Sequence, residues 1–352
     1  MSQLFAERFK AARKRNGLSL QDLSDKLENK ISRQGLHKYE KGDVLPDSRM
    51  IDWLCEVFDV RPEYFFRDVK VELGEIKFRK LNNFPVKEKD AIVEKTRETV
   101  SRYLELEDIL HINRDFVNHI GHITIQSNED VERAANLLRE KWGLGVDPLG
   151  NVVELLEDNH IKVIEIFEQD GFDGMQTLVN NTIPVIALNS SKLIQHDRKR
   201  FTALHELGHL LLTFDESVSS RDRELFCHYF AGALLLPSVS AEKELGKNRT
   251  KLYINELGVL KQQYGISIQA LIHRLHNLEI INKAYTDYFL KFIKDQGWKV
   301  EEPFQYVGKE TSKRFLQLVF RGLAEDQITM SKAASLNNMK LADFREEILK
   351  VR

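Results

Sequence analysis

The stretch RFTALHELGHLLL, residues 200–212, decides how the middle of this chain folds. Its apolar flanks predict a helix that packs into a core. On that helix His205 and His209 are four residues apart, so their imidazoles project from one face, one turn apart. Buried histidine and glutamate side chains are costly unless they are paired, and binding a metal ion removes that cost. The sequence therefore predicts a metal site on a buried helix.

The spacing of the two histidines is typical of a zinc site. Zn²⁺ takes nitrogen ligands at about 2.0–2.1 Å in tetrahedral geometry, which leaves positions for a third protein ligand and a water molecule. Glu206, next to the first histidine, is expected to contact that water as a general base instead of binding the metal. The ion lowers the pKa of bound water towards about 7, so a carboxylate can remove its proton at neutral pH.

A third ligand is expected on a separate element, because one helix face supplies only two. A polar reversal follows the first helix, and Glu224 then begins a second helix with core-like apolar residues. Glu224 is the favoured ligand, whereas Asp215, Glu216 and Asp222 are interpreted as solvated loop carboxylates. His228, one turn after Glu224, has three interpretations: an alternative ligand, a catalytic residue that polarises a substrate carbonyl, or a hydrogen-bonded histidine outside the ligand set.

Further segments extend this pattern in order along the chain. They are DG at 173–174, PVIALN at 184–189, RKRFTALHELGHLLL at 198–212, FA at 230–231 and LLLP at 234–237. From about residue 131 to 237 the chain resembles the ImmA/IrrE family of zinc metallopeptidases. The resemblance implies that His205, His209 and Glu224 bind Zn²⁺ and that Glu206 is the catalytic base.

The resemblance also implies a place for a peptide substrate. The strand ending at Asn189 would be a sheet edge on which the peptide lies extended and pairs through its backbone. The substrate contacts expected there are Val185, Ile186, Ala187 and Leu188. Cys227 and His228 stand where the family usually has Ala-Asn, so the local substrate contacts differ from the family pattern.

The N-terminal segment is basic and helical. Residues 1–49 contain eleven Lys or Arg and seven Asp or Glu, a local charge of +4 on an otherwise acidic chain. Apolar spacing through Phe5 and Phe9, a stop at Asn16-Gly17 and an N-cap at Ser19 predict several short helices. The runs RFKAARKRNGLSLQDLSDKL at 8–27 and ISRQGLHKYEKG at 31–42 resemble the helix-turn-helix domain of the Xre/Cro family.

This second resemblance implies a reader of double-stranded DNA. A short helix started by Ser32 would enter the major groove, with side chains able to bond bases or phosphates, while Gln21 lies near the backbone. The residues expected to contact DNA are Gln21, Ser32, Arg33, Gln34, His37 and Lys38. The alternative is a small helical bundle used only for protein contact.

Composition limits the remaining possibilities. The chain has 352 residues, which normally exceeds one compact core, and its net charge of −2 requires any DNA site to be a local patch. Two distant cysteines fit neither a disulfide scaffold nor a thiolate zinc site. With no signal core and no apolar stretch that could span a membrane, a cytoplasmic protein is expected.

The predicted fold is α+β and predominantly helical. Four consecutive regions are expected: a helix-turn-helix domain at 1–68, a linker and long helix at 69–125, a zincin-like domain with a small sheet at 126–240 and a helical region at 241–352. The long helix is predicted from Lys87 to about Ile120, and strands are predicted at Ile161–Phe167 and Ile183–Leu188.

Two functions from different classes are consistent with the sequence. The first is a DNA-binding regulator with a zinc endopeptidase that cleaves a helix-turn-helix repressor, or its own linker around Lys70–Lys89, in stress or mobile-element control. The second is a DNA-binding regulator whose metal domain senses a ligand without cutting. Glu206 favours the first, because a structural metal site needs no base. The expected partners are DNA and a protein substrate, with no membrane, and a homodimer is left open.

Overall fold

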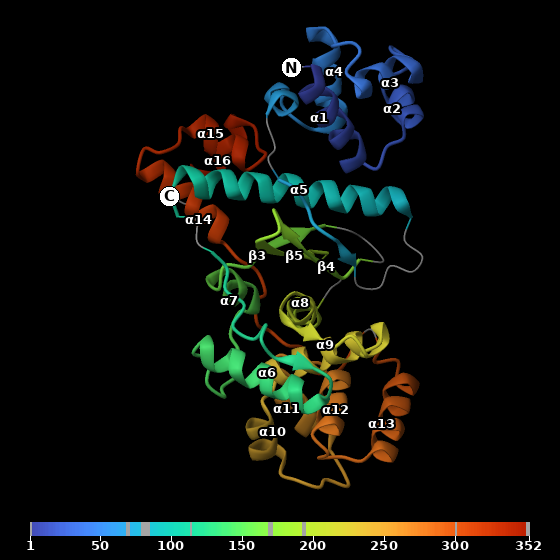
Figure 1. Ribbon diagram of the computed structural model, residues 1–352, viewed down its shortest axis with the longest axis vertical. Helices are drawn as coiled ribbons and strands as arrows, with labels where there is room; N and C mark the ends of the chain where they lie inside the picture. Colours follow the sequence, from blue (N-terminus) through green and yellow to red (C-terminus); the bar gives the residue numbers. More distant parts are fainter. Residues whose placement is uncertain are drawn as a thin grey trace. The chain divides into compact units, whose positions relative to one another are not determined.

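The computed structural model of the chain describes residues 2–67, 71–78, 85–112, 115–167, 172–191, 195–299 and 301–349 (Figure 1). Contacts divide the chain into two compact units, one formed by Met1–Leu73, Leu81–Asn113 and Lys313–Arg352, the other by Gly74–Lys80 and Arg114–Ser312. The predicted class is confirmed, since the described residues are predominantly helical with small sheets. Within the described ranges, no helix is both long and apolar enough to cross a bilayer.

Short helices form the N-terminal bundle of the first unit. They are α1 (Ser2–Arg15), α2 (Leu20–Lys26), α3 (Arg33–Lys41), α4 (Ser48–Phe58) and the 3-10 helix η1 (Pro62–Phe66). The predicted N-cap at Ser19 is confirmed, because its hydroxyl accepts the Asp22 N–H and the Asp22 carboxylate accepts the Ser19 N–H. Buried Phe5, Phe9, Leu36, Leu54, Phe58 and Phe65 form the core of this bundle.

The long helix α5 (Val86–Ile109) belongs to the same unit and contacts α1. The prediction that it continues to about Ile120 was wrong: the chain leaves the helix at Leu110, and His111 has a left-handed φ of +51°. The buried Arg8 Nη2 lies 2.7 Å from Glu98 Oε2, so an ion pair links α1 to α5. A buried charge pair of this kind is costly to break, because the remaining charge loses its partner.

The last three helices of the chain also pack in the first unit. They are α14 (Arg314–Ala324), α15 (Met330–Leu336) and α16 (Leu341–Leu349). Their buried apolar side chains form one cluster with Tyr103, Leu106 and Leu110 of α5 and its end.

The second unit is built on a mixed sheet with strand order β1-β4-β5-β3. Its strands are β1 (Lys77–Phe78), β3 (Lys162–Ile166), β4 (Gly174–Val179) and β5 (Ile183–Asn189). β5 runs parallel to β3 and antiparallel to β4, and β1 runs antiparallel to β4. A separate parallel pair joins β2 (Thr124–Ile125) to β6 (Thr213–Phe214).

Helices of the second unit share one large apolar core with this sheet. They are α6 (Asn128–Lys141), α7 (Val152–Asp158), α8 (His196–Leu211), α9 (Ser220–Leu235), α10 (Ser238–Leu245), α11 (Ile254–Tyr264), α12 (Ile268–Asn277) and α13 (Lys283–Asp295). α8 contacts β4, β5 and α9, so it lies between the sheet and the next helix. The core extends from Ile120 to Ile293. Residues 241–352, treated as one region in the sequence analysis, are therefore divided, because α10–α13 share this core whereas α14–α16 pack on α5.

Candidate metal centre

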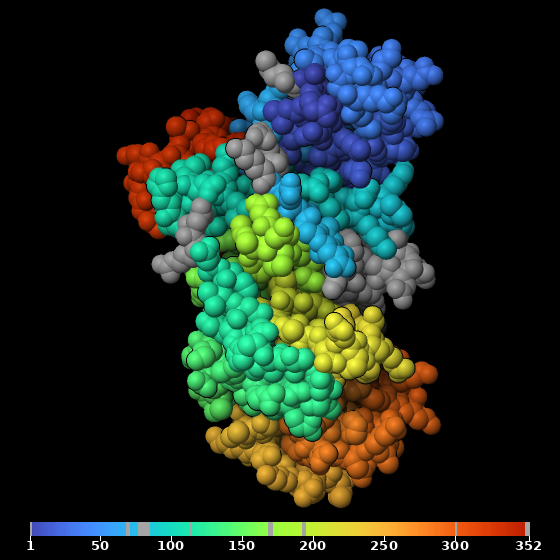
Figure 2. All heavy atoms as spheres, viewed as in Figure 1, coloured from blue at the N-terminus to red at the C-terminus, as the bar shows by residue number. Residues whose placement is uncertain are grey.

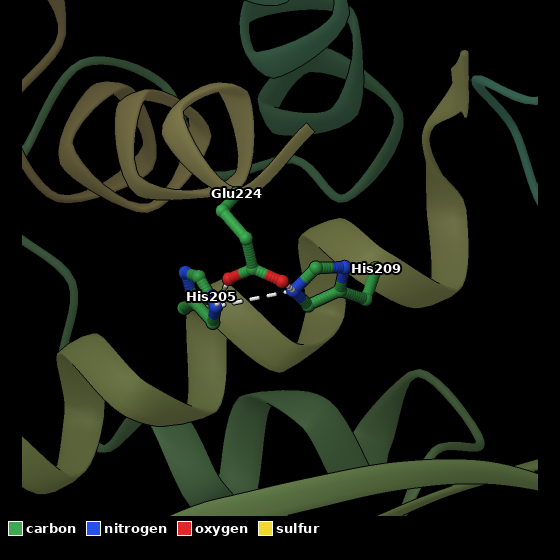
Figure 3. A group of neighbouring side chains, drawn as sticks. All are labelled: His205, His209 and Glu224. Carbon is green, nitrogen blue, oxygen red and sulfur yellow. Dashed lines mark hydrogen bonds and ion pairs between the residues drawn. The ribbon is translucent and has the colours of Figure 1, made fainter. Parts of the chain in front are cut away.

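Helices α8 and α9 bring three ligand atoms together (Figure 3). His205 Nε2 lies 3.1 Å from His209 Nε2, and the Glu224 carboxylate oxygens lie 3.3 Å from the first nitrogen and 3.2 Å from the second. Both histidines project from one face of α8, as their spacing predicts, and Glu224 comes from the second turn of α9. Among the described residues, this is the one group of His, Cys, Asp or Glu ligand atoms that converges closely enough to hold a metal ion.

The donor atoms fit a tetrahedral ion. Bonds of about 2.0–2.1 Å at tetrahedral angles separate neighbouring ligand atoms by about 3.3–3.4 Å. The two imidazole nitrogens are 3.1 Å apart and each has one Glu224 oxygen at 3.2–3.3 Å, while one ligand atom from each residue lies within 4.8 Å of the others. The His205 side chain has no exposed surface, whereas that of Glu224 is 54% exposed, so the ligand set is reached from the Glu224 side. Hydrogen bonds from His205 and His209 lower the pKa of the Glu224 carboxyl, which keeps this ligand ionised.

Glu206 lies beside the first residue of β4. A Cβ atom built on Gly174 would be 3.4 Å from Glu206 Cγ and 2.7 Å from Thr202 Cγ2, so only glycine allows strand and helix to approach this closely. Glu206 itself is 1% exposed. The residue expected to act as the base therefore lies next to the metal ligands on α8 and next to the start of a strand.

Two further residues of α9, His228 and Cys227, contact the histidines of the ligand group. The His228 ring centroid is 4.3 Å from that of His205 and 6.0 Å from that of Phe201, but His228 does not join the converging ligand group. Buried Cys227 places its Sγ 3.4 Å from Nδ1 of His209, the nitrogen that faces away from the ligand cluster. Such a contact behind a ligand fixes the ring orientation.

The three carboxylates interpreted as loop residues lie outside the ligand group. Asp215 accepts hydrogen bonds from Ser217 and Gln126, and Asp222 accepts one from Ser219 at the start of α9. Glu216 is exposed.

Buried charged residues anchor the first turns of α8. Arg200 donates to the Leu149 carbonyl at 2.8 Å, and its Nη1 lies 3.3 Å from Glu310 Oε1. Lys261 Nζ lies 3.0 Å from Asp197 Oδ2, which also fixes the start of the helix. These partners could not be predicted from the motif, because they come from segments far from it in the chain. The one available signal was the position of Arg200 directly before the apolar part of α8.

The prediction of a peptide-binding edge at Val185, Ile186, Ala187 and Leu188 was wrong. All four residues have 0% exposure, and their strand lies between β4 and β3 with backbone pairing on both sides. A peptide cannot add to a strand whose two edges are already paired. The sheet strand that reaches Glu206 is β4, which the sequence analysis did not predict.

The residues expected to contact DNA lie together on the N-terminal bundle. All six are exposed, and they line one surface groove of about 990 Å³. They are Gln21, Ser32, Arg33, Gln34, His37 and Lys38. The Ser32 hydroxyl accepts the Gly35 N–H at 3.2 Å and so also caps α3. α3 thus presents polar and basic side chains on one face, as a recognition helix requires.

Comparison with protein families agrees with both sites. Residues 9–65 match the family model for a helix-turn-helix, and residues 159–276 match a peptidase family model described as the IrrE N-terminal-like domain. No curated protein matches the chain. The matched ranges include α3 and its exposed face, and the helices that carry His205, His209 and Glu224. The chain therefore joins a helix-turn-helix DNA-binding domain to a metallopeptidase-type domain of the IrrE kind.

Proposed function

We propose that this chain is a DNA-binding transcriptional regulator with a zinc-dependent endopeptidase activity. The observation that carries the proposal is the convergence of two imidazole nitrogens and a carboxylate at 3.1–3.3 Å, with a second glutamate adjacent on the same helix. A purely structural site would use the three ligands but would not need Glu206.

Each residue of the centre has a distinct role in this proposal. His205, His209 and Glu224 hold Zn²⁺, which when bound polarises a peptide carbonyl and acidifies water. The Glu206 carboxylate takes a proton from the attacking water and delivers it to the amide nitrogen that leaves. We assign to His228, whose ring centroid is 4.3 Å from that of His205, a hydrogen bond to the substrate carbonyl oxygen. We assign to Cys227 the orientation of the His209 ring, which its Sγ contacts.

The proposed substrate is a flexible segment of a helix-turn-helix repressor, or the linker of this chain, in stress or mobile-element control. Part of the Lys70–Lys89 linker named above, residues 70 and 79–84, lies outside the described residues. The proposal is supported by the presence of a DNA reader and a metal centre on one chain. A cytoplasmic location fits this role.

Metal content and cleavage test the assignments separately. Purified wild type is expected to hold about one zinc ion per chain, and His205→Ala is expected to lose it because two ligands bind too weakly. Glu206→Gln, which keeps the side-chain shape, is expected to retain zinc while cleavage of a casein substrate falls by about a thousandfold or more. If Glu206→Gln loses zinc as completely as His205→Ala, then Glu206 is a ligand and its assignment as the base is wrong.

A further inference from the structure

The outer edge of β4 leads to the metal centre. β4 pairs with β5 along one edge, and its first residue, Gly174, lies against Glu206. An extended peptide paired with the other edge would therefore run past the proposed base. Backbone pairing of this kind is a general way in which a sheet binds a peptide.

That outer edge is already paired with a segment of the same chain. In β1, Lys77 is opposite Gln176 and Phe78 is opposite Met175, in antiparallel register. Upstream, the Gly74 N–H donates to the Leu178 carbonyl at 2.8 Å. In the space-filling view, the blue residues of this segment lie against the yellow-green residues of the sheet (Figure 2). The segment Gly74–Phe78 thus uses the backbone groups that an added peptide would need.

Gly74 makes this close approach possible. A Cβ atom built on it would lie 2.9 Å from the Leu178 carbonyl oxygen, a backbone atom that cannot turn aside as a flexible side chain could. Any residue other than glycine would push the segment away from β4. Gly150, in the same unit, has no atom within 4 Å of a built Cβ and provides a matched control.

The segment runs towards the end of β4 that lies against Glu206. Because β1 is antiparallel to β4, the chain moves towards the start of β4 as it goes from Gly74 to Phe78. Phe78 is opposite Met175, one residue from Gly174 and hence from the residue that touches Glu206. The segment also needs no association from solution, since a tether keeps its effective concentration in the millimolar range for short linkers.

We propose that Gly74–Phe78 is a tethered occupant of the peptide-binding edge of β4, so that another polypeptide binds at the metal centre only after this segment is released. An effect of this segment on cleavage requires the proposed endopeptidase function, so this part of the inference rests on that proposal. The position of Gly74–Phe78 on the edge of β4 follows from backbone pairing alone.

Disulfide trapping tests the position of the segment without any cleavage assay. In a Cys55→Ser background, Lys77→Cys and Gln176→Cys place two thiols on directly opposed residues, a geometry that a disulfide can span. We expect mild oxidation of the zinc-loaded full chain to form the intramolecular bond, while each single-cysteine variant forms none. Failure of the double variant to cross-link would overturn the pairing.

Peptide binding then tests the competition. The probe is a fluorescein-labelled peptide with the sequence VELGEIKFRKLNNF, residues 71–84 of this chain, added to zinc-loaded Glu206→Gln protein so that it cannot be cut. Gly74→Ala is expected to bind this probe about tenfold more tightly than the parent, because the competent state is more populated, whereas Gly150→Ala matches the parent. The oxidised Lys77→Cys/Gln176→Cys protein is expected to bind about tenfold more weakly than its reduced form.

The outcomes separate this inference from the proposed function. Equal probe binding by locked, parent and Gly74→Ala proteins, or no binding by any of them, would overturn the inference. Casein cleavage by the same proteins carrying the native Glu206 tests the activity independently. If none cuts casein while the probe still discriminates among them, the tethered occupant stands and the endopeptidase proposal fails.

Discussion

Glu310 is a carboxyl group without exposed surface, and its partner Arg200 is equally buried. Burial raises the pKa of Glu310 to about 7, although Arg200 and the Val152 N–H, which donates at 2.8 Å, both favour the ionised form. Because the folded-state pKa lies above the ordinary value of 4.5, the folded chain binds more protons than the unfolded chain between these two values. The stabilisation is fully present below about pH 4.5 and is lost as the pH rises through about 7.

This residue therefore predicts a pH dependence of stability. Between pH 5 and 7.5, the free energy of unfolding of the second unit is expected to fall by up to about 3 kcal/mol through Glu310. Glu310→Gln cannot ionise, so its stability should change less over this range, whatever the cost of the substitution itself. Urea unfolding of both proteins at four pH values measures the slopes. Parallel slopes would show that Glu310 does not carry the effect.

Individual ligands could be predicted from sequence where the backbone fixes their relation. His205 and His209 are one helical turn apart, so helix geometry alone places both imidazoles on one face. Glu224 could also be predicted from the sequence, because it lies near the start of the next apolar helix. The Arg200–Glu310 pair could not be predicted from the sequence, because no local rule relates residues that are 110 positions apart in the chain.

The exposed face of α3 predicts how substitutions change DNA binding. If Arg33 and Gln34 bond bases, Arg33→Ala or Gln34→Ala should reduce sequence preference by about 1–3 kcal/mol each. Lys41→Ala, at the exposed end of α3, should instead weaken all DNA sequences alike and reduce the salt slope by about one. Selection from random duplexes, followed by anisotropy at several salt concentrations, measures both quantities. Equal affinity of wild type and an Arg33/Gln34/Lys38 triple alanine variant would refute DNA reading by this helix.

Strand β4 shows which elements sequence patterns miss. Residues 174–179 lack a long apolar run, so they were not predicted as a strand, whereas the almost wholly apolar β5 was. A usable signal lay in the turn that joins them. Asn180 and Asn181 have φ values of +49° and +60°, as a type I′ turn requires, and asparagine tolerates this conformation well. Recognising that hairpin would have paired one edge of β5 with β4. Pairing of its other edge with β3 then places β5 in the sheet interior, which moves the peptide edge to β4.

Neither compact unit is a continuous piece of the chain. The segment Gly74–Phe78 interrupts the first unit and pairs with the sheet of the second, and the chain returns to the first unit at residue 313. α14–α16 then bury apolar residues of α5, including Leu106, that would otherwise face water. The predicted division into four consecutive regions was wrong in this respect, because periodicity identifies helices but not their distant partners. One physical consequence is that a chain cut after α5 would expose an apolar surface.

The activity of the whole molecule can be decided in its native cell. A peptidase with a tethered occupant at its peptide edge is expected to be selective, so wild type should generate only a few new protein N-termini. Glu206→Gln, which is expected to keep its zinc, and His205→Ala, which is expected to lose it, should both abolish those N-termini. Proteome-wide mapping of N-termini in cells expressing each protein, at rest and after DNA damage, measures this. New N-termini inside a helix-turn-helix protein or within residues 70–89 of this chain would identify the substrate. Identical maps for wild type and Glu206→Gln under both conditions would favour the regulator whose metal domain senses a ligand without cutting.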